Sequence, residues 1–175
     1  MHSNYEVERK FLMRTMPELP VKERHVVRQA YIYASDTCEM RLMVRFDRDT
    51  YDTLWPNVNK AKLTIKMGNG KVREETEIHL TQEQVTELCR ALPNQLFITK
   101  YFTIFDLGNG LTFEFSSVDP NLETGFLYGE IEFPSVDAAD EYEVPKTLLD
   151  CIKEEVTDDD TYQMKNYWRR TRLGQ

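Results

Sequence analysis

The chain has 175 residues, with 30 Asp and Glu against 22 Lys and Arg, and a formal net charge of -8 at pH 7. This length predicts one domain, residues 1–175, which can bury a core without disulfide staples. The acidic balance argues against the broad basic surface that nucleic acid or an anionic membrane requires, so we expect neither as a partner. The cysteines number 3, with no C-x-x-C pair, and no apolar run has signal or membrane-spanning length. These features together predict a cytoplasmic protein.

Alternating apolar and polar residues predict eight strands, and glycine-rich turns separate several of them. The expected strands cover residues 5–12, 23–34, 38–46, 60–68, 71–80, 95–107, 110–118 and 125–133. Gly68-Asn69-Gly70 and Gly108-Asn109-Gly110 are typical hairpin turns, and a polar loop with Trp55-Pro56 follows the third strand. The order of the strands therefore indicates a mostly antiparallel sheet.

One segment between the fifth and sixth strands has a clear helical pattern. Thr81 can cap a helix over residues 81–92, with Gln84 three positions later and an apolar stripe that includes Val85 and Cys89. Pro93 ends this helix. In the last forty or so residues we expect helical segments at 137–141, after Pro145 through Leu148, Leu149 and Ile152, and at 157–170.

The polar faces of the strands carry both signs of charge. Successive strand residues point to opposite faces, so Glu6, Glu8 and Lys10 share one face and Val7 and Phe11 the other. The same parity gives polar faces with Arg41, Met43 and Arg45; Lys62, Thr64 and Lys66; Arg73, Glu75, Glu77 and His79; Lys100 and Phe102; Thr112, Glu114 and Ser116; and Glu130 and Glu132.

Two structures are compatible with such faces. The first is a flat sheet whose charged face is solvated and laced with salt bridges. The second is a closed barrel with a wide polar lumen, in which facing charges are costly unless a ligand of opposite charge binds there. Because nearly every strand shows the pattern, we expect the second: an α+β protein built on an eight-stranded antiparallel β-barrel with a few flanking helices.

The ordered series of motifs resembles a known family. Glu6-Val7-Glu8-Arg9-Lys10 resembles the ExExK signature of the CYTH superfamily, the triphosphate tunnel metalloenzymes. The resemblance continues along most of the chain through VRQAYI (27–32), EMRL (39–42), LTIK (63–66), REETEI (73–78), GEIEF (129–133) and EEVTDDDTYQMK (154–165). It implies a tunnel that binds a triphosphate together with Mg²⁺ or Mn²⁺.

The resemblance also implies roles for individual residues. The implied metal ligands are Glu6, Glu8, Glu130 and Glu132, whose hard oxygens suit Mg²⁺ and Mn²⁺. Glu75 and Glu77 would hold a second metal ion or orient the attacking water, beside Lys66. The implied phosphate-binding residues are Lys10, Arg41, Arg45, Lys66, Arg73, Lys100 and Lys165. Such chemistry consists mainly of positioning and charge neutralisation.

The sequence departs from the family pattern at three positions. Met43 and Phe102 stand where the family's third and sixth strands present a second cation, and Ser116 stands where its seventh strand often has Asp. Arg45 can replace the missing cation of the third strand only if the register or a bulge allows it. These departures bear on turnover more than on the fold.

Several alternatives remain open at this stage. Asp158-Asp159-Asp160 either supplies a metal ligand or forms the first turn of a helix capped by Thr157, and Lys165 either closes the tunnel or is solvated. The leading function is metal-dependent hydrolysis of inorganic triphosphate or a small organic triphosphate. A class IV adenylyl cyclase and a non-catalytic polyphosphate- or nucleotide-binding module are the alternatives. The sequence does not define the oligomeric state, a homodimer included.

Overall fold

The computed structural model describes residues 5–49, 51, 58–68 and 72–174, so Trp55 and the turn residues Asn69 and Gly70 lie outside the described part of the chain. The strands are β1 (Tyr5–Met13), β2 (Val21–Ala34), β3 (Cys38–Asp47), β4 (Val58–Met67), β5 (Val72–His79), β6 (Ile98–Asp106), β7 (Thr112–Val118), β8 (Phe126–Phe133) and β9 (Ile152–Glu155). The helices are α1 (Gln82–Ala91), η1 (Asn94–Leu96), α2 (Val136–Glu141), α3 (Lys146–Leu149), η2 (Asp160–Tyr162), α4 (Met164–Trp168) and the π-helical turn η3 (Arg169–Leu173).

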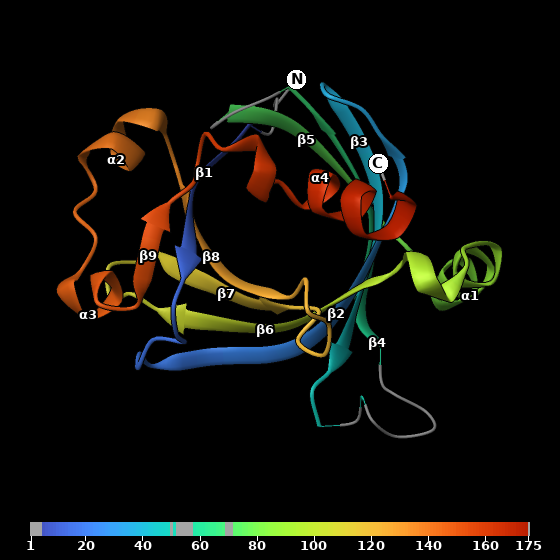
Figure 1. Ribbon diagram of the computed structural model, residues 1–175, viewed down its shortest axis with the longest axis horizontal. Coiled ribbons are helices and arrows are strands. Elements are labelled where there is room, and N and C mark those ends of the chain that lie inside the picture. Colours follow the sequence, from blue (N-terminus) through green and yellow to red (C-terminus); the bar gives the residue numbers. More distant parts are fainter. Residues whose placement is uncertain (1–4, 50, 52–57, 69–71, 175) are drawn as a thin grey trace.

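The first eight strands form the closed antiparallel barrel that the alternation predicts. Their order around the barrel is β5-β4-β3-β2-β6-β7-β8-β1, and β1 also pairs with β5 to close it (Figure 1). One edge of β1 pairs with β8 along most of its length. On the other edge, Tyr5 to Val7 pair with β5, while Phe11 to Met13 pair with β9. The ninth strand therefore continues the sheet along β1 beyond the point where β5 pairs with it.

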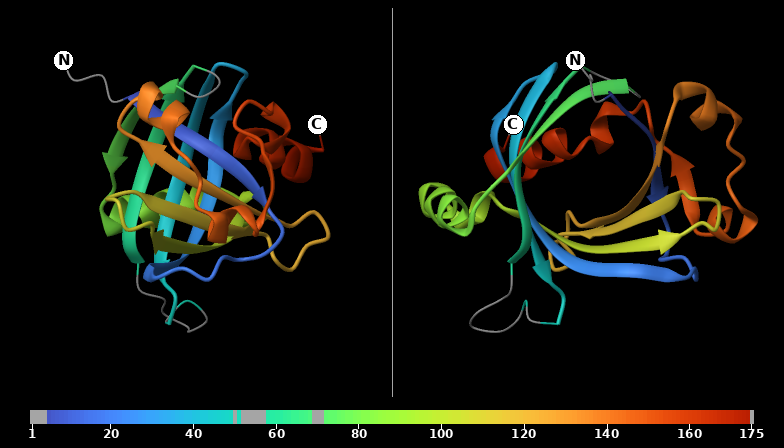
Figure 2. Two further views of the ribbon diagram at one scale, coloured as in Figure 1. Left: turned by 90° about the vertical axis from the view of Figure 1, so that its left-hand side faces the viewer. Right: turned by 180° about the vertical axis from the view of Figure 1, so that it is seen from behind.

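Two clusters of the hydrophobic core lie between the strands and the outer helices, and a third packs Met164 of α4 against Tyr31 and Tyr128, which line the barrel interior. One cluster joins Phe11, Phe113 and Ile131 to residues of α2 and α3, and another packs Val85 of α1 against Leu42 and neighbouring residues. Figure 2 shows α1 on one side of the barrel and α2 and α3 on the opposite side. Because these helices cover the outward faces, the inward faces are free to be polar.

The predicted capping of α1 is confirmed. The Thr81 side chain accepts a hydrogen bond from the backbone N–H of Gln84, and the Gln84 side chain accepts one from the backbone N–H of Thr81. Val85 is buried, as predicted. Cys89 is exposed, so the prediction that it belongs to the buried stripe is wrong. The apolar stripe of this helix is thus narrower than its sequence suggests.

Gly129 fits a close approach on the outer face of the barrel. It lies opposite Phe11 on β1 and Phe115 on β7. A Cβ atom at Gly129 would lie 2.0 Å from Phe113 Cζ, a distance that no side chain tolerates without displacement. The glycine of the GEIEF segment therefore leaves space for the tip of the Phe113 ring against β8, while the glutamates on either side of Ile131 face the interior.

The last part of the chain differs most from the prediction. Ile152 does not extend a helix but begins β9, because its backbone pairs with Met13 of β1. Thr157 does not cap a helix: its hydroxyl accepts from the backbone N–H of Lys10 and donates to Glu155. Asp159 instead caps the short η2, and the expected helix over 157–170 is divided into η2, α4 and η3.

The C-terminal helices are fastened to the barrel by side chains. Trp168 Nε1 donates to the backbone oxygen of Leu96 over 2.6 Å. Tyr167 and Arg172 both donate to the buried carboxylate of Asp119, over 2.8 and 2.6 Å. This places α4 across part of one barrel opening (Figure 1). Among the described residues, none of the helices combines the length and the apolar character needed to cross a membrane.

Candidate active site

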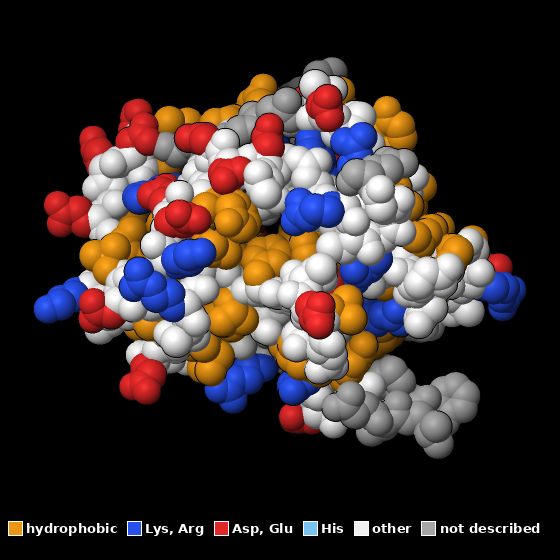
Figure 3. Space-filling model, viewed as in Figure 1, with side chains coloured by type: hydrophobic (Ala, Val, Ile, Leu, Met, Phe, Trp, Pro, Cys, Tyr) orange, Lys and Arg blue, Asp and Glu red, His pale blue; other side chains and the backbone are white. Residues whose placement is uncertain are grey.

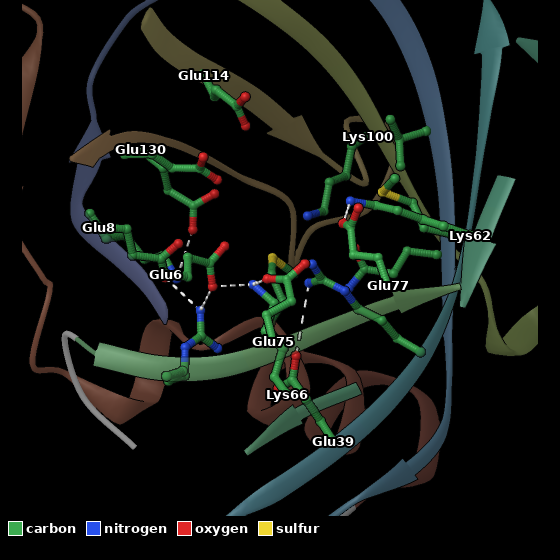
Figure 4. A pocket seen from close by; sticks show the side chains of 18 of the residues that line it. Glu6, Glu8, Glu39, Lys62, Lys66, Glu75, Glu77, Lys100, Glu114 and Glu130 are labelled. Carbon is green, nitrogen blue, oxygen red and sulfur yellow. Dashed lines mark hydrogen bonds and ion pairs between the residues drawn. The ribbon is translucent and has the colours of Figure 1, made fainter. Parts of the chain in front are cut away.

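The interior of the barrel is a charged cavity of about 670 Å³. Eight glutamates and eight lysines or arginines are among the described residues that line it. The glutamates are Glu6, Glu8, Glu39, Glu75, Glu77, Glu114, Glu130 and Glu132, and the cations are Lys10, Arg41, Arg45, Lys60, Lys62, Lys66, Arg73 and Lys100. Glu114 and Glu130 point into the cavity from one side, and Lys62 and Lys100 from another (Figure 4). On the molecular surface seen in Figure 3, acidic and basic side chains are interspersed.

Where β1 meets β5, two cations pair with the glutamates of the first strand. Arg73 stands directly opposite Glu6 in the strand register. Its guanidinium lies 2.7 Å from Glu8 Oε1 and 3.1 Å from Glu6 Oε2. Lys66 is also paired with Glu6, and its Nζ lies 3.0 Å from Glu75 Oε2. The parity argument therefore brings these five side chains together as predicted.

Where β1, β8 and β7 meet, like charges lie side by side. Glu8 stands opposite Glu132, and Glu130 stands opposite both Lys10 and Glu114. Lys10 Nζ lies 2.9 Å from Glu130 Oε1 and 3.7 Å from Glu8 Oε1. Carboxylates directly opposite each other on neighbouring strands repel one another, and a single lysine offsets only part of that repulsion. This wall of the cavity is suited to a further cation.

The pKa values of the cavity carboxyl groups are shifted in opposite directions. Burial opposes the charge of Glu8, but Lys10, Lys66 and Arg73 outweigh it and lower its pKa to about 2. Burial, reinforced by neighbouring carboxylates, raises the pKa values of Glu114 and Glu132 to about 7. Burial also raises the pKa of Glu6 in spite of its cationic neighbours. A cation that binds here would stabilise the ionised forms of these carboxyl groups and lower their pKa values.

The two lysines on the other side lose part of their basicity. Burial, together with the nearby guanidinium of Arg41, lowers the pKa of Lys62 to about 8, although Lys62 is paired with Glu77. Burial lowers the pKa of Lys100 to about 7. Lys100 Nζ donates to the hydroxyl of Tyr128 over 2.8 Å. Anionic oxygens in the cavity would favour the ammonium form of both lysines.

Glu75 and Glu77 lie on β5 with their carboxylates toward neighbouring β4. Burial alone would raise the pKa of Glu75. The charge of Lys66 and its hydrogen bond to Glu75 outweigh burial, so the net shift of this pKa is downward. Glu75 is thus held as a carboxylate next to the residue that also grips Glu6. Both glutamates line the cavity, so each has access to a water or a metal ion within it.

The two residues of β3 and β6 that depart from the family pattern face the cavity, as the parity predicts. Met43 and Phe102 both line it, with Arg41, Arg45 and Lys100. Arg45 lines the cavity; its pairing with β2 is regular, whereas the pairing of β3 with β4 shifts register between Arg45 and Phe46. Ser116 is fully buried on β7 and is not among the lining residues.

Lys165 takes neither of the places considered for it. It is buried, and its Nζ donates to the backbone oxygen of Asp36 over 2.7 Å, in the turn between β2 and β3. The cavity is lined instead by Gln163 and Met164 just before it. The acidic run Asp158 to Asp160 lies outside this cavity, along a separate surface depression.

Among the charged cavity residues that were not assigned a role from the sequence are Glu39, Lys62 and Glu114. Glu39 and Lys62 lie on the polar faces of β3 and β4, and Glu114 lies on that of β7. Glu39 is buried, with its carboxylate 3.9 Å from the guanidinium of Arg41. Alternation alone would have found all three, because each is an even number of positions from a residue that was assigned.

The residues present fit a divalent ion such as Mg²⁺ or Mn²⁺. The four implied ligands, Glu6, Glu8, Glu130 and Glu132, offer only hard carboxylate oxygens from adjacent strands. Within the described residues, no three acidic, His or Cys groups are already gathered as a metal site. The reason is visible in the contacts: Arg73, Lys66 and Lys10 stand between these carboxylates. A metal ion would have to exchange places with them.

Comparison with known proteins shows similarity at the level of structure. No family model matches the sequence, and no curated protein matches it. The chain is similar to the inorganic triphosphatase NE1496, with 27% identity, 93% of both chains covered and a TM-score of 0.57. A second structure of NE1496 gives 28% identity over 93% of this chain and 96% of that one, with a TM-score of 0.58.

More distant structures share the fold. HpAC1 from Hippeastrum, an adenylyl cyclase candidate with a dominant triphosphatase activity, is 12% identical, with 77% of this chain and 82% of that chain covered and a TM-score of 0.55. A conserved hypothetical protein from Pyrococcus furiosus is 21% identical over 77% of this chain and 82% of that one, with a TM-score of 0.52.

Proposed function

We propose that this chain is a divalent-metal-dependent triphosphatase of the CYTH superfamily, which hydrolyses inorganic triphosphate or a small organic triphosphate inside the barrel. The observation that carries the proposal is the cavity with eight carboxylates and eight lysines or arginines. Burying so many charges is costly unless a ligand repays the cost. A polyphosphate with its metal ions offers both signs of charge at once. The similarity to NE1496, an inorganic triphosphatase, supports this assignment.

In the proposed complex, the cations exchange carboxylate partners for phosphate oxygens. Arg73 and Lys66 now pair with Glu6 and Glu8 near one side of the cavity. Phosphate oxygens accept from guanidinium and ammonium groups at least as well as carboxylates do. With Lys100 on the other side, these residues hold the triphosphate chain and neutralise its charge.

The carboxylates released by this exchange would hold the metal. Glu6 and Glu8 on β1 and Glu130 and Glu132 on β8 are the ligands we propose, with Mg²⁺ or Mn²⁺ as the ion. When bound, the metal supplies charge neutralisation for the phosphate oxygens and for the leaving oxygen.

Hydrolysis requires a water and a proton acceptor, and Glu75 is suited to be that acceptor. Lys66 keeps it ionised, so it can orient a water and take its proton as the water oxygen attacks the terminal phosphorus. The bond between that phosphorus and the bridging oxygen then breaks, which releases orthophosphate and diphosphate. Glu77, paired with Lys62, is the second candidate for this role.

A substrate panel with product identification tests the proposal. Purified protein with Mg²⁺ or Mn²⁺ would be given inorganic triphosphate, ATP and a non-nucleotide triphosphate ester, and the products separated by ion exchange. We expect orthophosphate and diphosphate from inorganic triphosphate. Cyclic AMP and diphosphate from ATP, without phosphate release, would assign the chain to the cyclases instead. Tight binding of triphosphate without turnover would make it a binding module and overturn the proposal.

A further inference from the structure

One wall of the cavity differs from the rest because apolar side chains gather on it. Val27 of β2 stands directly opposite Arg45 on β3 and Lys100 on β6. Met43 and Phe102 are its diagonal neighbours on those two strands, close enough for side-chain contact. All five residues line the cavity. Val27, Met43 and Phe102 thus form an apolar patch, which we call the β2–β3–β6 patch, flanked by two cations.

Arg45 brings an unused hydrogen-bond donor to this patch. Its guanidinium carbon lies 5.4 Å from the centre of the Phe102 ring. Its ion-pair partner is the exposed Glu23, at 3.6 Å. Arg45 Nε is buried, and no acceptor for it is found among the described residues. A buried donor without a partner costs free energy, which a ligand with an acceptor at this point would recover.

The volume of the cavity leaves space beside a triphosphate. An inorganic triphosphate has three phosphorus and ten oxygen atoms, and even at the ~30 Å³ that a water occupies in the liquid these fill only about 390 Å³. The cavity measures about 670 Å³. Metal ions with their waters take part of the difference, and the remainder admits a small organic group.

We propose that the β2–β3–β6 patch binds the aromatic ring of an organic triphosphate, so that the preferred substrate is a triphosphate ester with a neutral aromatic heterocycle. This inference rests on the triphosphatase function proposed above and specifies its substrate class. An aromatic ring can stack on Phe102 and contact Val27 and Met43, and a ring nitrogen or oxygen can accept from Arg45 Nε. A neutral ring fits better than a cationic one, because Arg45 and Lys100 flank the patch.

Binding of three ligands that do not turn over tests the inference. These are diimidotriphosphate, β,γ-imido-ATP and the β,γ-imido analogue of ribose 5′-triphosphate, which is the second ligand without its base. Dissociation constants would be measured by calorimetry with Mg²⁺ present. We expect β,γ-imido-ATP to bind about ten- to a hundred-fold more tightly than the ribose analogue, the range usual for stacking of one base on an aromatic side chain.

Variants of β6 separate the ring contact from the rest of the site. Phe102→Ala should reduce the preference for β,γ-imido-ATP over the ribose analogue to below about three-fold, whereas Phe102→Trp should retain it. Tyr101→Ala is the matched control, since Tyr101 is the adjacent residue on the outer face, beneath Arg48; it should keep the full preference. Thermal melts identify any variant that fails to fold, and in that case Val27→Ala replaces it.

The outcomes distinguish this inference from the function on which it rests. Equal binding of the ATP and ribose analogues by the unaltered protein would overturn the ring site while leaving the triphosphatase intact. A preference that survives Phe102→Ala would also overturn it, because the base would then bind elsewhere. Failure of all three ligands to bind would overturn the proposed function itself.

Discussion

Replacing Arg73 should make the free protein bind metal more tightly. The guanidinium of Arg73 contacts both Glu6 and Glu8, at 3.1 and 2.7 Å, and its side chain is only 13% exposed. A metal ion that takes Glu8 as a ligand must first break the shorter of these contacts. Arg73→Gln removes that competition and leaves the two glutamates next to each other without their shared cation.

The size of the effect follows from the contact that is lost. A hydrogen bond to a charged group contributes about 1.5–3 kcal/mol, and every 1.4 kcal/mol is about a factor of ten in affinity. We therefore expect Arg73→Gln to tighten Mn²⁺ binding by about ten- to a hundred-fold in the absence of triphosphate. The same variant should weaken triphosphate binding, because a phosphate contact is lost.

Electron paramagnetic resonance of free Mn²⁺ measures this affinity without any turnover. Arg9→Gln is the matched control, because Arg9 lies on β1 next to Glu8 but pairs with Glu155 on the outer face. This control should bind Mn²⁺ as the unaltered protein does. Unchanged Mn²⁺ affinity in Arg73→Gln would refute the reasoning: it would mean that Glu6 and Glu8 do not ligate the metal.

Three further predictions concern affinity, protons and stability. Met43→Arg should tighten inorganic triphosphate binding by about ten-fold or more, since Met43 lines the cavity and a guanidinium there gains a charged hydrogen bond; weaker binding in calorimetry would count against this. Triphosphate binding at pH 8 should take up protons, and its affinity should fall as pH rises above about 7, because Lys100 titrates with a pKa of about 7 in the free protein and phosphate favours its ammonium form. Calorimetry in two buffers of different ionisation enthalpy measures that uptake, and an unchanged uptake in Lys100→Met would mean that Lys100 does not meet the ligand. Asp119→Ala should cost about 3–5 kcal/mol in urea unfolding, because it strands the buried Arg172; a loss below about 1 kcal/mol would contradict the fastening of the C-terminal helices.

The alternation of apolar and polar residues was enough to predict most of the barrel strands and their inward faces. The side-chain period of a strand is two, so a run such as Glu6, Glu8 and Lys10 assigns both faces at once, and one apolar face per strand requires a cover. The same rule placed Met43 and Phe102 inside the cavity, where the structure has them. Parity could predict which residues share a face, whereas the residues that lie opposite one another depend on the register between strands.

The C-terminal region was beyond the reach of such patterns. Ile152 follows two leucines, a spacing that fits a helix, but a free edge of β1 beyond β5 captures it as strand β9. Thr157 is a residue type that commonly caps helices. In the structure its hydroxyl instead accepts a hydrogen bond from the backbone N–H of Lys10 on β1. Lys165 likewise finds the backbone of Asp36. In each case a contact with a residue distant in the sequence determines the local structure, and the neighbouring sequence does not indicate that contact.

The pairing of the cavity charges was also not predictable. Parity shows that Arg73, Glu6 and Glu8 share the interior, but not that one guanidinium bridges both carboxylates. That arrangement depends on how β5 meets β1 at the closure of the barrel, which short-range patterns do not specify. It also explains why the implied metal ligands are held by cations in this structure.

Phosphate release from inorganic triphosphate, measured with and without metal, tests the central claim most directly. The unaltered protein should release phosphate with Mg²⁺ or Mn²⁺ and stop when a chelator removes the ion. Glu8→Gln should lose turnover with either ion while its melting temperature shows a folded protein, because Glu8 faces the cavity and packs in no apolar cluster. Full activity in chelator, or in Glu8→Gln, would contradict a metal-dependent triphosphatase with this site.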